Sequence, residues 1–119
     1  MTQADLFDNM QRTARARLLR DQGMQTAIDH ADAVSEEWSE RAYGKLRAYV
    51  AGLHSGALFT CEVVRDYAER SGLPPPPDKR AWGGIMVRGR HAGLFRKHGF
   101  TIATDPKVHC NPVSQWVRS

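Results

Sequence analysis

Four consecutive prolines constrain the fold of this 119-residue chain more than any other feature. The prolines at residues 74–77 cannot continue a helix, because proline lacks a backbone N–H and its ring clashes with the preceding turn. One helix is predicted before them, over about residues 61–71, with Gly72 as its C-terminal stop. A second helix is predicted after them, over residues 79–93, with Asp78 as its cap. The sequence therefore predicts two helices joined by a stiff connector.

The helix predicted over residues 79–93 has an apolar side and a basic side. At 100° per residue, the side predicted to face the core carries Trp82, Ile85, Met86, Gly89 and Gly93. The opposite side carries Arg80, Gly84, Val87, Arg88 and His91. Gly83 and Gly84 together cost about 2 kcal/mol relative to two alanines in a helix interior, so something is expected to need the missing side chains. A DNA backbone, a neighbouring helix or an irregular helix would each account for them.

From Leu94 onward the apolar residues alternate with polar ones, which is typical of strands. The first strand is marked by Leu94, Phe95, Phe100 and Ile102, and the second by Val113, Trp116 and Val117. Residues 105–112 join the two strands, bounded by prolines, and carry Lys107 and His109. A short apolar segment at residues 57–59 predicts a further strand before Thr60, which is expected to cap the next helix.

The first part of the chain, residues 1–56, is predicted to be helical. Residues 1–20 form a flexible or helical arm, in which Leu6, Met10, Ala14 and Leu18 are four residues apart and share one face. Gly23 is expected to end this helix, and Ser35 is expected to cap the next one. That next helix buries Trp38, Ala42, Leu46, Tyr49, Val50 and Leu53.

The element order in residues 57–119 is strand, helix, connector, basic helix and hairpin, which predicts a winged-helix domain. The fold class is therefore mainly α with a small β-hairpin. In winged-helix proteins the second helix of the helix-turn-helix pair enters the major groove of DNA, while the hairpin lies along the backbone or the minor groove.

Charge is distributed unevenly along the chain. Residues 1–78 contain 9 basic and 12 acidic side chains, whereas residues 79–119 contain 8 basic side chains and a single acid, Asp105. A segment of one sign indicates a polyanionic partner, so we expect double-stranded DNA to bind here. The residues predicted to contact it are Lys79, Arg80, Arg88, Arg90, His91, Arg96, Lys97, His98, Lys107 and His109.

Residues 75–95, which read PPPDKRAWGGIMVRGRHAGLF, are followed by Gly99 and Phe100. This run resembles a recurrent segment of small winged-helix proteins encoded in phage and prophage genomes, in which a proline-rich turn leads into an A-x-G-x-x-x-R-x-x-x-x-G-L/F helix and a strand. The resemblance covers about half the chain and implies DNA binding in replication or transcription control, without a defined reaction. The extra glycine at Gly84 and the long loop between the two predicted strands, the wing, depart from the pattern. At those points, the roles of individual residues are not carried over from these proteins.

The pentapeptide at residues 3–7, QADLF, is similar to the Gln-x-Ser/Asp-Leu-Phe peptide by which bacterial replication and repair proteins dock on the sliding clamp. This resemblance implies a partner-binding site at Gln3, Asp5, Leu6 and Phe7. A glutamine amide would anchor the peptide by hydrogen bonds while the two apolar side chains fill a pocket. The alternative is that Leu6 and Phe7 form the first turn of the N-terminal helix and are buried against the protein.

The sequence contains no pattern that favours catalysis or a metal site. Cys61 and Cys110 are too few for a disulfide framework or a structural zinc site, and both are expected to be reduced thiols. The five histidines lack HExxH-type spacing. We therefore expect no cofactor, no metal and no enzymatic activity. Without an apolar run of about 18 residues or a signal peptide pattern, a cytoplasmic location is expected, with no membrane partner.

A protein-interaction adaptor is the alternative function, because winged helices also serve that role. In this case the helical N-terminal part would form a homodimer or bind a host protein. A continuous positive face over residues 79–93 would favour DNA, whereas an exposed apolar patch would favour a protein partner.

Overall fold

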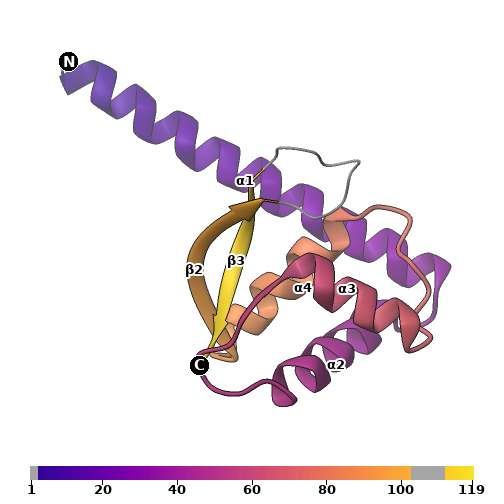
Figure 1. Cartoon of the computed structure of the whole chain (residues 1–119). Helices are drawn as coiled ribbons and strands as arrows, with labels where there is room; N and C mark the ends of the chain where they lie inside the picture. Colours follow the sequence, from indigo (N-terminus) through magenta and orange to yellow (C-terminus); the bar gives the residue numbers. More distant parts are fainter. Residues whose placement is uncertain (1–2, 103–111) are drawn as a thin grey trace.

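The computed structural model describes residues 3–102 and 112–119, and within them it contains four helices and three strands (Figure 1). In chain order these are α1 (Gln3–Val34), α2 (Trp38–Ala51), β1 (Leu58–Thr60), α3 (Cys61–Arg70), α4 (Arg80–His91), β2 (Phe95–Ile102) and β3 (Pro112–Arg118). The prediction of a mainly helical fold with a small amount of β structure is confirmed. None of the described helices is both long and apolar enough to cross a membrane.

The three strands form one antiparallel sheet in the order β1-β3-β2. Trp116 of β3 is the register partner of Phe59 on one side and of Lys97 on the other. The register of β2 shifts between Lys97 and Gly99, where Gly99 has a φ of 150° that favours glycine. Both predicted strands of the hairpin are present, and the strand predicted at residues 57–59 is β1. The connection that carries Lys107 and His109 lies outside the described residues.

The helix α1 is continuous, so the prediction that it ends near Gly23 is wrong. Gly23 lies in its interior, where a Cβ atom would be 3.0 Å from Nη1 of Arg80 on α4. A single glycine costs a helix only about 1 kcal/mol, and the packing of α1 against α4 outweighs that cost. Figure 1 shows the second half of α1 lying along the body of the protein while its first half extends away as a free arm.

Two of the three glycines of α4, Gly83 and Gly84, face α1. A Cβ atom at Gly83 would lie 2.8 Å from Sδ of Met24, and one at Gly84 would overlap Cδ1 of Ile28. Of the three explanations for these glycines, the structure supports the neighbouring helix, and that helix is α1. The outward side of the first half of α4 is therefore covered by the protein itself.

The turn between α1 and α2 differs from the prediction that Ser35 caps the second helix. The helix α1 continues to Val34, and the N–H of Ser35 still donates to the carbonyl of Ala31 at 2.8 Å. A carboxylate from α1 does the capping instead. Asp32 accepts hydrogen bonds from the backbone N–H of Ser39 at 2.7 Å and from its hydroxyl at 2.8 Å.

One hydrophobic core joins the two parts of the chain. The indole rings of Trp38 and Trp82 meet edge to face, with centroids 5.5 Å apart, and Nε1 of Trp38 donates to the carbonyl of Pro74 at 2.8 Å. Trp82, Ile85, Met86 and Gly89 are buried as predicted, whereas Gly93 lies beyond the end of α4 with a φ of 79°. Because α2 shares this core with α4, the predicted boundary at residue 56 passes through it.

Candidate nucleic-acid interface

Asp78 holds the start of α4 and the first of the predicted DNA-binding arginines. Its Oδ1 accepts the backbone N–H of Arg80 at 2.9 Å, and its carboxylate forms an ion pair with the Arg80 guanidinium at 2.6 Å. The hydrogen bonds from the side chain and backbone of Arg80 lower the pKa of Asp78, and the carboxylate in turn raises the pKa of Arg80. The charge of Arg80 is therefore already matched within the protein.

Arg88 is similarly engaged. Its Nη1 lies 2.9 Å from Oε1 of Glu40 on α2, and its guanidinium carbon lies 3.9 Å from the centre of the Tyr43 ring. From the sequence alone, replacing Arg80 and Arg88 by glutamate is predicted to abolish binding to duplex DNA and to leave folding intact. The structure changes that prediction, because a glutamate at either position would face a carboxylate and disturb the protein itself.

The other described basic residues of the predicted site are exposed and form no ion pair within residues 3–102 and 112–119. Lys79 precedes α4. The remaining five follow one another at the C-terminal end of α4 and along β2, and we call them the basic rim: Arg90, His91, Arg96, Lys97 and His98. A three-residue turn, residues 92–94, separates the two groups. Among the described residues, the rim is thus a basic edge with no carboxylate paired to it.

An exposed aromatic side chain, Phe100, follows the basic rim on the same strand, β2. Phe100 is 64% exposed, and Nζ of Lys97 lies 4.3 Å from the centre of its ring. An exposed aromatic ring beside a cation can contact a nucleotide by stacking as well as by charge. In the sequence, Phe100 served only to mark the predicted strand, and its exposure in the edge strand β2 was not predicted.

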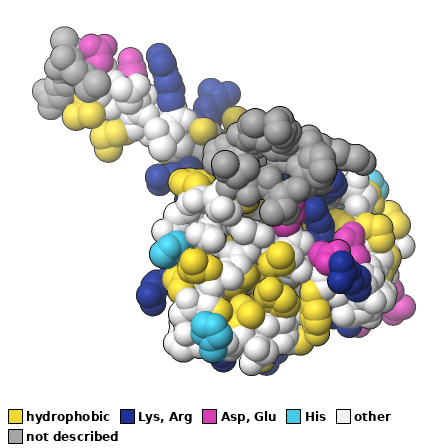
Figure 2. All heavy atoms as spheres, viewed as in Figure 1, with side chains coloured by type: hydrophobic (Ala, Val, Ile, Leu, Met, Phe, Trp, Pro, Cys, Tyr) yellow, Lys and Arg dark blue, Asp and Glu magenta, His cyan; other side chains and the backbone are white. Residues whose placement is uncertain are grey.

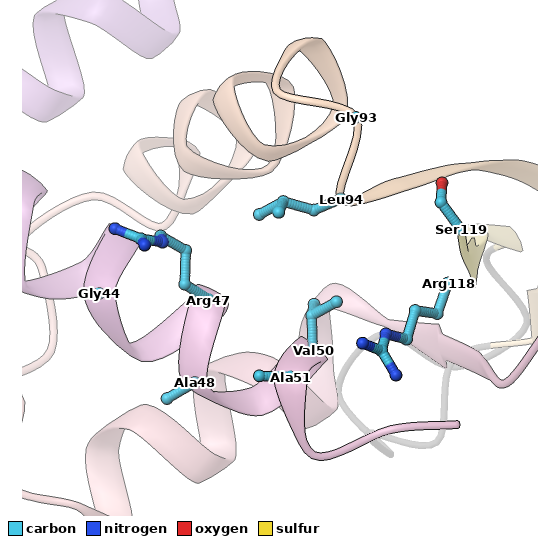
Figure 3. A pocket seen from close by; sticks show the side chains of 9 residues that line it. All are labelled: Gly44, Arg47, Ala48, Val50, Ala51, Gly93, Leu94, Arg118 and Ser119. Carbon is cyan, nitrogen blue, oxygen red and sulfur yellow. The ribbon is translucent and has the colours of Figure 1, made fainter. Parts of the chain in front are cut away.

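A cleft of about 600 Å³ opens next to the turn that joins α4 to β2. Figure 3 shows Arg47 of α2 and Arg118 of β3 on opposite sides of it, with Gly93 and Leu94 at its border. The Arg118 guanidinium donates to the carbonyl of Leu53. Neither arginine was among the predicted site residues. Arg47 comes from α2, far from residues 79–119 in the sequence, and only the pairing of β2 with β3 brings Arg118 to the start of β2. Together they extend the cationic surface next to the rim.

The N-terminal peptide is accessible, and the alternative that its apolar residues are buried is wrong. Leu6 is 53% exposed and Phe7 is 59% exposed, on the first turns of α1. Asp5 is exposed as well, while the side chain of Gln3 lies outside the described ones. The peptide is therefore presented at the end of the arm, in helical form.

The described residues contain no group of three or more histidine, cysteine or acidic side chains that could hold a metal ion. Cys61 is a free thiol, and burial raises its pKa to about 11, so it stays protonated at neutral pH. Cys110, Lys107 and His109 lie outside the described residues. Comparison of the chain with protein-family models, curated proteins and solved structures finds no match.

Proposed function

We propose that this protein is a non-catalytic winged-helix protein that binds double-stranded DNA through the basic rim. The observation that carries the proposal is the position of the rim at the junction of α4 and β2, the two elements with which winged-helix domains contact DNA. The chain order from α2 to β3 and the strand order β1-β3-β2 support a winged-helix assignment. The resemblance of residues 75–95 to phage and prophage proteins suggests a role in replication or transcription control.

Charge supplies the chemistry of this proposed contact. Guanidinium and ammonium groups bind phosphate oxygens through charge-assisted hydrogen bonds, and each cation that neutralises a phosphate also releases counterions. The rim supplies Arg90, Arg96 and Lys97 for this purpose, and His91 and His98 add polar contacts. None of the five has to leave an ion pair within the described residues before it can contact DNA.

The packing of α1 limits how α4 can read DNA. Met24 and Ile28 contact the outward side of α4 at Gly83 and Gly84, so this part cannot enter a major groove while α1 stays in place. The last turn of α4 and the strand β2 remain accessible. We therefore propose that phosphate contacts dominate and that sequence preference is weak.

Fluorescence anisotropy with a labelled duplex tests the proposal. Three rim cations on phosphates predict that log K falls with log salt at a slope of about −3 between roughly 50 and 200 mM salt, because each contact contributes about −0.9. A single strand of the same length measures the preference for duplex. Absence of binding at the lowest salt, or an affinity that does not change with salt, would contradict the proposal and favour the adaptor alternative.

The exposed peptide at the end of the arm supports a second proposal, recruitment by the sliding clamp. A pull-down with a bacterial sliding clamp is expected to retain the wild-type chain and to lose the variant with Leu6→Ala and Phe7→Ala, because both side chains would leave an apolar pocket. Leu19→Ala is the matched control, since Leu19 is 57% exposed but lies outside the peptide. Equal retention of all three chains would rule out recruitment through this peptide.

A further inference from the structure

The arm is the exposed first part of α1, residues 5–22, which extends beyond the core. Every residue from 5 to 22 is exposed, so about 27 Å of helix at a rise of 1.5 Å per residue stands clear of the core. Most helical stability in proteins comes from packing an apolar face, and the arm packs none of its own against the core. The arm is therefore available to pack against another surface.

An apolar stripe runs along the arm. It consists of Leu6, Met10, Ala14 and Leu18, four residues apart, and the three larger side chains are 53%, 63% and 56% exposed. Such i, i+4 rows are the ridges that interlock when two helices pack together. Figure 2 shows apolar side chains on the lower side of the projecting arm, with basic side chains above them and where the arm meets the body. The stripe thus has the form of half of a helix–helix interface.

We infer that the arm pairs with the arm of a second copy of this chain, in antiparallel orientation, about a two-fold axis near Arg12. This alignment places Leu6 opposite Leu18 of the second copy and the long Met10 opposite the small Ala14. A parallel alignment would instead place Met10 against Met10 and Ala14 against Ala14, which crowds one level and leaves a gap at the next. Side-chain size therefore favours the antiparallel pair.

The charges of the arm favour the same orientation. Its first turns carry Asp5 and Asp8, and its later turns carry Arg15, Arg17 and Arg20 against one acid, Asp21, which pairs with Arg20. Figure 2 shows the acidic side chains toward the tip and the basic ones nearer the body. Asp5 and Asp8 lie on the side of the helix away from the stripe, so their effect acts at longer range. An antiparallel pair brings the acidic end of one arm near the basic end of the other, whereas a parallel pair brings like charges together. Antiparallel helix dipoles add to this preference.

A second copy also covers more of the stripe than the proposed clamp peptide does. That peptide ends at Phe7, which leaves Met10 and Leu18 uncovered. A two-fold pair is self-complementary by construction, so one stripe supplies both sides of the interface. The inference does not depend on DNA binding, because residues 5–22 contribute nothing to the basic rim.

Sedimentation velocity on the full chain tests the pairing. A contact between two single helices is expected to bury less than the roughly 1,200 Å² of stable complexes. We therefore expect micromolar association, with the average mass rising toward twice 13.4 kDa between about 1 and 200 μM. Leu18→Glu is expected to keep the chain monomeric. Leu19→Glu is the matched control, because Leu19 is equally exposed but lies 100° away from Leu18, off the stripe.

A wild-type chain that stays monomeric over this range would overturn the inference, as would equal effects of Leu18→Glu and Leu19→Glu. Near-ultraviolet circular dichroism checks that each variant stays folded, because Trp38, Trp82 and Trp116 are buried in the core and none of them lies in the arm. Loss of pairing can therefore be told apart from unfolding. Orientation is tested by oxidising Leu6→Cys and Leu18→Cys chains, separately and mixed, with the wild type as background. Faster crosslinking in the mixture supports the antiparallel pair, and faster crosslinking within each single variant overturns it.

Discussion

Reversing Arg90 and Lys97 together to glutamate is expected to lower the affinity for duplex DNA about 100-fold at moderate salt. Each cation would lose a charge-assisted contact worth roughly 1.5 kcal/mol, and two such losses give about that factor. Repulsion between the new carboxylates and the phosphates can only add to it. The measurement is the anisotropy titration described above, at one fixed salt concentration.

The matched control reverses Arg41 and Lys45 on α2, which changes the net charge by the same amount. Lys45 donates to the carbonyl of Ser71 at the end of α3, so this pair lies on a different part of the surface. Neither pair forms an ion pair within residues 3–102 and 112–119, and circular dichroism checks that both variants fold, because Lys45→Glu also loses this hydrogen bond. Affinity is expected to fall less than about 3-fold in the control. Equal losses in the two variants would mean that only net charge matters and that the basic rim is not the binding site.

The features that the sequence predicted well are those encoded locally. The apolar side of α4 follows from the helical spacing of Trp82, Ile85 and Met86, and all three are buried. The end of α3 follows from Gly72, whose φ of 100° suits glycine, and from the hydrogen bond of 3.0 Å between the Leu73 N–H and the Ala68 carbonyl. Asp78 likewise binds the first turn of α4. Neighbouring residues suffice to determine each of these.

The features that the sequence predicted poorly depend on contacts between distant segments. Nothing near Gly83 reveals that Met24 fills the space beside it, so a covered face of α4 looked like a DNA-reading face. Arg88 and Glu40 are 48 positions apart, and their pairing removes Arg88 from the list of uncommitted cations. A helical wheel, drawn from the sequence at 100° per residue, shows which side chains point outward from a helix. It does not show which of them another helix will cover.

Replacing Trp38 by alanine is expected to lower the free energy of unfolding by about 3 to 5 kcal/mol, a large part of the roughly 5 to 15 kcal/mol of a typical domain. Trp38 is fully buried, packs edge to face on Trp82 of α4 and donates to the carbonyl of Pro74. The substitution leaves a cavity where α2, α4 and the proline connector meet. Chemical denaturation followed by tryptophan fluorescence and by circular dichroism measures the change.

Trp38→Phe separates packing from hydrogen bonding. Phenylalanine keeps a ring beside Trp82 but leaves the Pro74 carbonyl without its donor, so we expect a loss of about 1 to 3 kcal/mol. Because one core joins residues on both sides of position 56, fluorescence and circular dichroism should report a single transition in both variants. Two separate transitions, with the part from β1 to β3 keeping its wild-type stability, would show that residues 57–119 fold independently and would contradict a shared core. The basic rim would then belong to a unit that does not need α2, and its DNA affinity would survive the loss of Trp38.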